Sequence, residues 1–464
     1  MSPPGTPPNP LRVAIIGSGP AAFYVAERLL KVLETEVSID MFERLPAPFG
    51  LVRYGVAPDH QKIKQVTRVF DRVARHDTFR FFGNVEYGKH VGLEDLRRHY
   101  HQVCFATGAQ TDRELGIPGD GLERSHSATE FVAWYNGHPD FRHCRFDLSA
   151  ERVAVVGVGN VAVDVARILC RTPDELARTD IADYALEALR QSKVREVIML
   201  GRRGPAQAAF TNPEVRELGQ LEGADAVALA NEVALDPLSQ RVVDGTPDRD
   251  LTRRLEILNG MAATPPRGKP RRLILRFLVS PVALLDDGAG GVGGMRIVRN
   301  RLDRDGDRLR AVGTDIQRDL PVDMVFRSVG YRGVPLPGLP FDDRGGIIPN
   351  DGGRVVGDGG QFIHGLYVSG WIKRGPSGVI GTNKPDGKET ADAMVEDARA
   401  GRAFMPTATE PESAASLVRE RQPHVISYSD WQRLDAIEVE RGERAARPRV
   451  KFTDPEIMLR ALAQ

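Results

Sequence analysis

The chain has 464 residues, which is too long for a single hydrophobic core and predicts two or three domains. Lys plus Arg and Asp plus Glu both number 63, so no overall charge draws the protein to nucleic acid or to a membrane surface. Hydrophobic residues make up 41% and charged residues 27%, as in soluble globular proteins. No apolar run approaches the roughly twenty residues of a membrane span.

Three widely separated cysteines, Cys104, Cys144 and Cys170, form no C-x-x-C pair and no metal-ligand spacing. This usage fits a reducing compartment and excludes a dithiol relay, so we expect a cytoplasmic protein without a metal site. Residues 1–10 are half proline and contain no cationic or apolar block. We therefore expect a disordered tail there and not a targeting signal.

The first predicted unit is a buried strand, a glycine turn and a helix within Val13–Arg28. Four apolar residues precede the turn Gly17–Gly19, and helical periodicity begins at Ala21. Such a turn places helix N-terminal amides around a pyrophosphate, because the unpaired N–H groups and the helix dipole favour an anion. The next strand, Val37–Phe42, ends at Glu43, where an acid accepts both hydroxyls of an adenosine ribose. A turn that only packs strand against helix is the alternative.

The following segment, Leu45–His60, is too rich in proline and glycine for a regular element. Its apolar residues favour a loop folded over a ligand. A helix over Gln61–Arg75 and a short strand pair around Phe79–Tyr87 come next. A buried strand over Val103–Gly108 ends at a glycine, as expected where a sheet meets a cofactor.

The pattern of the opening recurs in Ser149–Asp164. A strand over Arg152–Val156, a turn over Gly157–Asn160 and a helix over Val161–Leu169 predict a second dinucleotide fold. A helical insertion over Arg171–Lys193 follows.

The strand Val194–Leu200 ends not in an acid but in Gly201, Arg202 and Arg203. Two guanidiniums at this place suit a ribose 2′-phosphate through charge-assisted bidentate bonds. The sequence therefore predicts NADPH rather than NADH as the second nucleotide. A surface arginine pair at a strand end is the alternative.

A helix is predicted over Thr211–Leu221, with Thr211 as N-cap and Glu214 completing a capping box. The segment Asp236–Gly268 is polar and only loosely periodic. Asp-Gly and Gly-Gly turns then separate three predicted strands, Arg272–Leu278, Val282–Leu284 and Gly294–Val298.

The strand Met324–Gly330 mirrors the earlier strand that ends at Gly108 and is expected to close the second domain. A further strand, Gly365–Ser369, leads into glycine turns over Gly370–Asn383 and a helix over Asp386–Ala400. These turns are another place where backbone amides can meet a ligand. The remainder, Glu412–Gln464, is predicted to be mostly helical and polar.

Two dinucleotide folds in one chain make chemical sense if one holds a flavin and the other a nicotinamide, so that hydride passes between the rings. We therefore predict an α/β protein with two Rossmann-like dinucleotide-binding domains. The FAD domain is expected over residues 11–109 and 335–464, with the NADPH domain, residues 110–334, inserted into it. In such a reaction the protein would mainly align the nicotinamide and flavin rings and balance their charge.

Several motifs resemble those of adrenodoxin reductase and its bacterial relatives, the NADPH–ferredoxin reductases of that type. They are Gly17–Tyr24, Phe49–His60, Phe82–Val85, Gly157–Asp164 and Gly370–Asn383, and the resemblance runs from about Leu11 to the last helix. It implies a FAD enzyme that takes hydride from NADPH and passes single electrons to a ferredoxin or similar acidic iron–sulfur protein. That carrier would serve a cytochrome P450 or another oxygenase.

The resemblance also implies cofactor contacts, carried over by matching motif. FAD would contact Gly17, Ser18, Gly19, Pro20, Ala21, Glu43, Leu51, Val85, Trp371, Gly378, Val379 and Ile380. The NADPH pyrophosphate would meet Gly157, Gly159, Asn160 and Val161, the 2′-phosphate Arg202 and Arg203, and the nicotinamide end Glu214 and Gly378. Arg113 is a further candidate for the same nucleotide.

Three residues are implied for catalysis: His60, Asp164 and Glu214. His60 and Asp164 match family positions that link the two domains near the flavin, where an imidazole can settle the protonation of the reduced ring. An ordinary loop histidine and a cap residue are the alternatives for His60 and Glu214. Asp164 lies on the inner face of an apolar helix, where an unpaired carboxylate is costly.

The family's basic docking position matches Arg216. Further positive charge comes from Arg253, Arg254, Arg267, Lys269, Arg271 and Arg272, for which a solvated surface is the alternative.

The chain lacks the sequence signatures of other classes of nucleotide-binding oxidoreductase. The NADPH-oxidising half of a glutamate synthase should carry N-terminal cysteine clusters, and this chain has none. Gly370–Trp371 stands where disulfide reductases have glycine and aspartate, which argues against that class. No run of cysteines typical of an iron–sulfur cluster exists at either end, so we expect no fused ferredoxin. A redox sensor that binds both nucleotides without turnover remains as an alternative.

Overall fold

The computed structural model describes residues 4–6, 9–32, 35–245, 247–306 and 308–463. The chain divides into two compact units. The first comprises Met1–Val56, His60–Thr111 and Gly330–Gln464, and the second comprises Ala57–Asp59 and Asp112–Val329. The second unit is therefore an insertion between two parts of the first in chain order.

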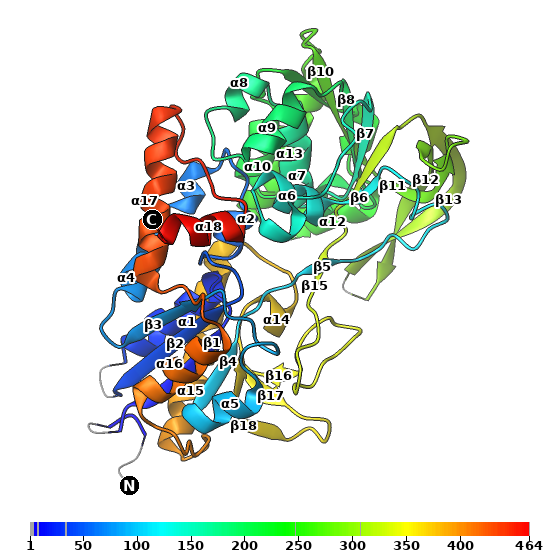
Figure 1. Cartoon of the computed structure of the whole chain (residues 1–464). Coiled ribbons are helices and arrows are strands. Elements are labelled where there is room, and N and C mark those ends of the chain that lie inside the picture. The colour runs from blue at the N-terminus through cyan, green and yellow to red at the C-terminus, as the bar shows by residue number, and fades with distance from the viewer. Residues whose placement is uncertain (1–3, 7–8, 33–34, 246, 307, 464) are drawn as a thin grey trace. The chain divides into compact units, whose positions relative to one another are not determined.

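The first unit is built on a seven-stranded sheet (Figure 1). The strands from β18 to β3 are parallel, and two antiparallel strands extend the sheet beyond β18. The spatial order is β16 (Asn350–Asp351), β17 (Arg354–Val356), β18 (Phe362–Val368), β4 (Gln102–Phe105), β1 (Leu11–Ile16), β2 (Val37–Glu43) and β3 (Phe79–Gly83).

Two helices that are far apart in sequence pack together on this sheet, α1 (Pro20–Leu30) and α15 (Asn383–Arg399). Their close approach requires Gly387, because an added Cβ there would lie 2.9 Å from Cβ of Tyr24. The late segment thus completes the fold that β1 and α1 begin, as the sequence predicts. The remaining helices of the unit are α2 (Leu51–Tyr54), α3 (Gln61–Lys64), α4 (Thr67–Ala74), α5 (Leu93–His99), α14 (Trp371–Arg374), α16 (Pro411–Arg421), α17 (Tyr428–Arg444) and α18 (Pro455–Leu462).

The second unit contains a six-stranded parallel sheet. Its order is β6 (Ser125–Ser127), β14 (Met324–Arg327), β7 (Arg152–Val156), β8 (Glu196–Gly201), β10 (Arg271–Phe277) and β9 (Ala224–Ala228). Its helices include α6 (Ala128–Tyr135), α7 (Asn160–Cys170), α8 (Pro173–Leu176), α9 (Asp183–Arg190), α10 (Asn212–Leu218) and α11 (Ala230–Val233). In both units a buried strand passes through a glycine turn into a helix, which confirms the predicted fold class.

A three-stranded antiparallel sheet adjoins the parallel sheet of the second unit (Figure 1). It consists of β11 (Val279–Asp286), β12 (Val292–Asp305) and β13 (Arg308–Leu320). The sequence predicts only short pieces of β11 and β12 and does not predict β13. Most side chains of β13 are exposed, so the strand lacks the apolar alternation that would indicate it.

Two predictions of local structure in this part of the chain are wrong. The helix predicted over Gln61–Arg75 is interrupted between α3 and α4, and Phe79–Tyr87 contains β3 alone, because Gly83 is hydrogen-bonded to Ile426 instead of a second strand. The polar segment Asp236–Gly268 forms α12 (Pro237–Gly245) and α13 (Arg249–Ala263). Helix α13 buries only Leu258 and Met261, which explains its weak periodicity.

Part of the predicted N-terminal tail is described. The Gly5 amide donates to the Asn9 carbonyl at 2.8 Å, and the Glu36 amide donates to the Gly5 carbonyl at 3.0 Å. These residues therefore have defined contacts where the composition predicts disorder.

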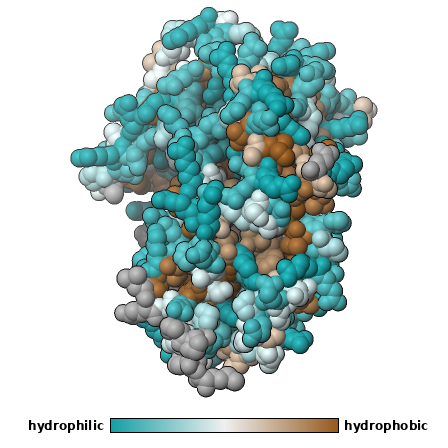
Figure 2. Space-filling view, turned by 60° about the vertical axis from the view of Figure 1, so that its left-hand side comes forward, coloured by the Kyte–Doolittle hydropathy of each residue, from teal (hydrophilic) through white to brown (hydrophobic). Residues whose placement is uncertain are grey.

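Figure 2 shows one face of the protein, on which hydrophilic residues predominate and apolar residues appear in smaller patches. Within the described ranges, no helix has both the length and the apolar character needed to cross a bilayer.

Candidate functional site

The glycine turn of the first unit is shaped by a close backbone approach. Gly17 has φ +101°, and an added Cβ would lie 2.5 Å from the Ala106 carbonyl oxygen. Gly19 precedes α1 and lies in open space, with nothing within 4 Å of an added Cβ among the described residues. Pro20 occupies the first helical position, where its missing N–H costs nothing. An anion can therefore reach the start of α1.

Glu43 lies at the carboxyl end of β2 and holds this turn. Its Oε2 accepts from the Ser18 amide at 3.1 Å and the Ser18 hydroxyl at 2.6 Å, and its Oε1 accepts from the Leu45 amide at 3.0 Å. Its backbone carbonyl accepts from the Val85 amide at 2.8 Å. Since a carboxylate offers about four lone-pair positions, Glu43 fixes the turn and retains capacity for a hydroxyl.

The loop before α2 packs directly on the glycine turn. The Phe49 amide donates to the Ser18 carbonyl at 3.0 Å, and Phe49 has φ +84°. An added Cβ on Gly50 would lie 2.9 Å from Cα of Gly19. Leu51 follows Gly50, begins α2 and is half-buried, and its contact with FAD remains a prediction.

The late glycine segment also reaches α1. Gly370 has φ +80°, and an added Cβ would lie 2.6 Å from Cβ of Ala21. Trp371 therefore lies close to the start of α1, where its indole Nε1 donates to the Ser377 carbonyl at 3.2 Å. A cavity of about 470 Å³ adjoins this segment and is lined by Arg374, Ser377, Gly378, Thr382, Pro385, Asp386 and Glu389.

Of the remaining residues predicted for this site, Val379 is 48% exposed and Ile380 is half-buried. Val85 is buried in the core and presents its backbone to Glu43.

The second unit repeats the arrangement. Gly157 has φ +140°, and an added Cβ would collide with the Ser328 carbonyl. Gly159 lies in open space before α7, and Val161 is half-buried on the first turn of that helix. The Asn160 side chain accepts from the Thr211 amide at 2.8 Å. Its amide oxygen therefore fixes the loop that leads to α10.

The two glycine-turn helices begin in the same way, which the short helices α2, α3, α4 and α14 share. Neither α1 nor α7 has a side-chain N-cap or an acid in its first turn. Five other helices, α6, α8, α13, α17 and α18, are capped by Ser127, Thr172, Asp248, Ser427 and Asp454 respectively. The first amides of α1 and α7 thus fit an external anion such as a pyrophosphate.

The arginine pair follows β8. Arg202 is exposed and Arg203 is half-buried. Burial, and next the neighbouring Arg202 charge, lower the pKa of Arg203. Neither guanidinium forms a hydrogen bond or ion pair with any described residue. Two close, uncompensated cations fit a doubly charged phosphate.

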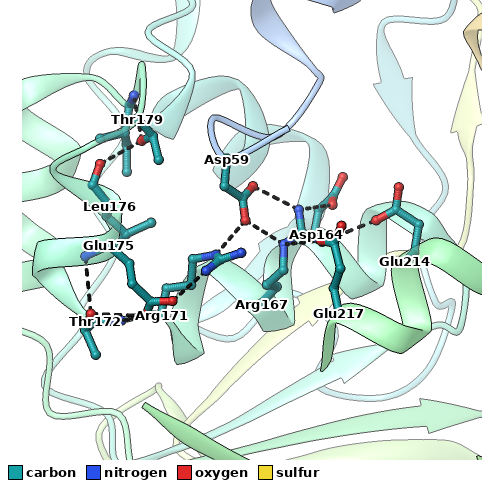
Figure 3. Close-up of polar contacts among 11 residues, drawn as sticks. Asp59, Asp164, Arg167, Arg171, Thr172, Glu175, Leu176, Thr179, Glu214 and Glu217 are labelled. Carbon is teal, nitrogen blue, oxygen red and sulfur yellow. Dashed lines mark hydrogen bonds and ion pairs between the residues drawn. The ribbon is translucent and has the colours of Figure 1, made fainter. Parts of the chain in front are cut away.

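Asp164 and Glu214 belong to a buried charge cluster around Arg167, which sequence analysis missed (Figure 3). Arg167 Nη2 lies 2.7 Å from Asp164 Oδ1, and Nη1 lies 3.3 Å from Glu214 Oε2. Asp59 receives two bonds from Arg167, at 2.7 and 3.0 Å, and one from Arg171 at 2.6 Å. The available signal was an arginine within the apolar run of α7.

Burial alone would lower the pKa of the fully buried Arg167, but the carboxylates of Asp164 and Asp59 raise that pKa well above its ordinary value. Arg167 is therefore a permanent cation. Asp164, expected on the inner face of an apolar helix, has its charge balanced there by Arg167.

The predicted capping box is wrong. Thr211 precedes α10, but its side chain makes no cap hydrogen bond. Glu214 is buried and bonds to Arg167. An ion pair with a buried cation outcompetes the weaker bond to a backbone amide.

His60 precedes α3 in the first unit, is half-buried, and accepts from the Ile63 amide at 3.1 Å through its carbonyl. Its relation to Asp164 remains a prediction. Arg113 is exposed on the segment after β5 (Thr111–Asp112).

Arg216 is exposed on α10. Most of the neighbouring basic residues predicted to add positive charge are engaged within the second unit. Arg253 pairs with Glu256, Arg272 pairs with Glu196, and the side chains of Arg254, Lys269 and Arg271 donate to the carbonyls of Ala208, Leu221 and Val194.

The pyridine nucleotide-disulphide oxidoreductase family matches residues 11–199. NADPH-ferredoxin reductase FprA of Mycobacterium tuberculosis is 46% identical over 97% of this chain and 99% of its own length. The mitochondrial NADPH:adrenodoxin oxidoreductase of Bos taurus is 42% identical over 97% of this chain and 92% of its own.

The solved structure of M. tuberculosis FprA in complex with NADPH superposes with a TM-score of 0.91 at 44% identity, covering 98% of this chain and 100% of the other. Similarity of this extent, together with the two glycine turns, shows that the chain belongs to the NADPH–ferredoxin reductases of the adrenodoxin reductase type.

Proposed function

We propose that the first unit binds FAD, that the second binds NADPH, and that the protein delivers single electrons to a ferredoxin. The observation that carries the proposal is the pair of uncapped glycine-turn helices that start in open space, one in each unit; after the second come two arginines whose guanidiniums pair with none of the described residues. The predicted domain bounds, 11–109 with 335–464 and 110–334, lie close to those of the two units.

FAD fits the first unit. The amides beginning α1 would bind its pyrophosphate, and the remaining acceptor position of Glu43 would take a ribose hydroxyl. Leu51 and Trp371 lie next to the same turn and would enclose the ligand. When bound, the flavin supplies the step from two-electron hydride chemistry to one-electron transfer.

NADPH fits the second unit. The start of α7 would bind the pyrophosphate, while Arg202 and Arg203 would bind the 2′-phosphate. Asn160 would hold the loop before α10 through its amide oxygen, which accepts from the Thr211 amide, and its backbone N–H would donate to the phosphates from the first turn of α7.

The residues proposed to take part in hydride transfer would act through their charge or by exchanging a proton. Asp164 and Glu214 pair with the permanent cation Arg167 and would orient the nicotinamide end. His60 would control the protonation of the reduced flavin ring. Gly378, on the rim of the cavity in the first unit, would leave room for the nicotinamide.

The acceptor is proposed to be an acidic iron–sulfur protein, serving a cytochrome P450 or another oxygenase. Arg216 is the favoured contact, because it is exposed on α10 and matches the basic docking position of the family. The relatives whose printed names include ferredoxin or adrenodoxin support this class of partner.

The cysteines support a reducing, cytoplasmic setting. All three are free thiols. Burial raises the pKa of Cys170 to about 12 and also raises the pKa of Cys104. Such thiols are inert and take no part in the proposed reaction.

The test is electron transfer from the NADPH-reduced protein to purified ferredoxins of both common cluster types, at low and high salt. We expect reduction of at least one ferredoxin, with slower association at high salt. If the protein oxidises NADPH but reduces neither ferredoxin at either salt concentration, the proposed acceptor class is wrong.

A further inference from the structure

The turn that carries the two arginines is held by the three-stranded sheet. Asn300 of β12 donates from Nδ2 to the Arg202 carbonyl at 2.8 Å. The Leu278 amide, between β10 and β11, donates to the Arg203 carbonyl at 3.1 Å. Both backbone carbonyls of the pair are therefore bound by residues at the root of this sheet.

Asn300 is well placed to hold a fixed geometry. It is 4% exposed, and its Nδ2 also donates to the Ser280 hydroxyl at 2.8 Å. Its backbone amide donates to the Leu278 carbonyl at 2.7 Å. The pairing of β12 with β13 shifts between Val298 and Asn300, so an irregularity in the strand lies at this residue.

Leu278 completes the arrangement. Its φ of +55° is uncommon for a residue other than glycine and persists only where surrounding bonds impose it. Here those bonds run from its amide to Arg203 and from Asn300 to its carbonyl. The arginine turn, Leu278 and Asn300 thus form one closed set of hydrogen bonds.

We infer that Asn300 is a positioning residue for the choice of NADPH over NADH. By fixing the Arg202 carbonyl, it limits where the two guanidiniums can point, which pair with nothing in the described part of the chain, and phosphate recognition by arginine depends on such geometry. The inference rests on the proposed function of the arginine pair. It also gives a role to β12, whose extent the sequence does not predict.

The test measures binding of two probes, adenosine 2′,5′-bisphosphate and adenosine 5′-diphosphate, by calorimetry on the intact protein. Asn300→Ala should weaken binding of the bisphosphate by about three- to tenfold, the cost of ordering an arginine side chain that is no longer held before binding, and leave the diphosphate unchanged. In turnover, the KM for NADPH should rise while kcat and the KM for NADH stay constant.

The matched control is Thr314→Val, which removes the bond from the Thr314 hydroxyl to the Arg299 carbonyl at 2.8 Å, within the same sheet. It should leave both affinities unchanged. Asn300→Asp keeps the side-chain volume but cannot donate, and it replaces Asn300→Ala if that variant does not fold.

Two outcomes would overturn the inference. One is an equal loss of affinity for both probes, which would mean a purely structural role, and the other is no loss of affinity for either probe. Arg202→Ala separates this inference from the proposed function. If Arg202→Ala leaves bisphosphate binding intact, the 2′-phosphate assignment itself fails. If Arg202→Ala weakens binding and neither Asn300 variant does, only the positioning role is wrong.

Discussion

Arg53 and Glu438 form a buried ion pair across 385 positions of sequence, with Nη2 2.5 Å from Oε1 and Nη1 2.8 Å from Oε2. The Arg53 guanidinium also lies 5.0 Å from the Trp431 ring. Arg53 belongs to α2, which Leu51 begins, and Glu438 belongs to α17. Helix α17 therefore holds the segment proposed to enclose the flavin.

Glu438→Gln should lower the free energy of unfolding by about 3–5 kcal/mol, because it leaves the buried Arg53 charge without its counterion. It should also speed the release of FAD, which flavin fluorescence after dilution would measure. Glu440→Gln, on the same helix but with a side chain 59% exposed, is the control and should change neither quantity. Unchanged flavin release in Glu438→Gln would disprove the link between α17 and the flavin segment.

The same pair predicts a pH dependence. Burial alone would raise the pKa of Glu438, but Arg53 lowers it below its ordinary value. A depressed pKa in the folded state contributes stability above the unfolded pKa of about 4.3, and that stability is lost as pH falls through the folded value. The acid side of the unfolding profile should therefore be steeper in the unmutated protein than in Glu438→Gln. Parallel profiles would contradict this.

Arg167→Gln should slow flavin reduction by NADPH and destabilise the protein at neutral pH by about 3–5 kcal/mol, because Asp59, Asp164 and Glu214 lose their shared buried cation. Part of the lost stability should return as pH falls, since protonation removes the uncompensated negative charge. Thermal unfolding across pH and single-turnover kinetics check both effects. The exposed Arg253→Gln serves as the control, and equal behaviour of the two variants would refute a special role for Arg167.

Arg202→Ala should raise the KM for NADPH more than about tenfold, the effect of losing a charged hydrogen bond of about 1.5–3 kcal/mol. The KM for NADH should not change. Arg195→Ala, with a side chain that is 75% exposed, controls for loss of positive charge near β8. If the unmutated protein uses NADH as well as NADPH, the phosphate assignment does not hold.

Arg216→Glu should raise the KM for ferredoxin at low salt, and the difference from the unmutated protein should shrink at high salt. Flavin reduction by NADPH should be unaffected, because Arg216 is exposed on α10 and is not among the residues assigned to either cofactor. Steady-state kinetics at two salt concentrations provide the measurement. A salt-independent change would argue against an electrostatic docking role.

The parts of the fold that were predictable depend on local signals. A buried strand, glycines with positive φ and an apolar helix recur around Gly17 and Gly157, so both dinucleotide folds are visible in the sequence. The arginines after β8 are equally local. Strand β13 was not predictable, because its side chains are mostly exposed and its pairing with β12 is a tertiary property.

Long-range partners account for the other misses. Glu214 matched a capping box, yet its carboxylate bonds to Arg167, 47 positions earlier. Asn300 lies 98 positions after Arg202, and no local pattern indicates that its amide reaches that carbonyl. Asp164 was singled out as a costly buried acid, and the same reasoning applied to Arg167 would have found its partner.

The most direct test of the account is anaerobic rapid mixing of the purified, yellow protein with NADPH. The account predicts fast loss of the visible flavin absorbance, with a much slower loss when NADH replaces NADPH. A protein that stays colourless after incubation with FAD, or bound flavin that NADPH leaves oxidised, would contradict it.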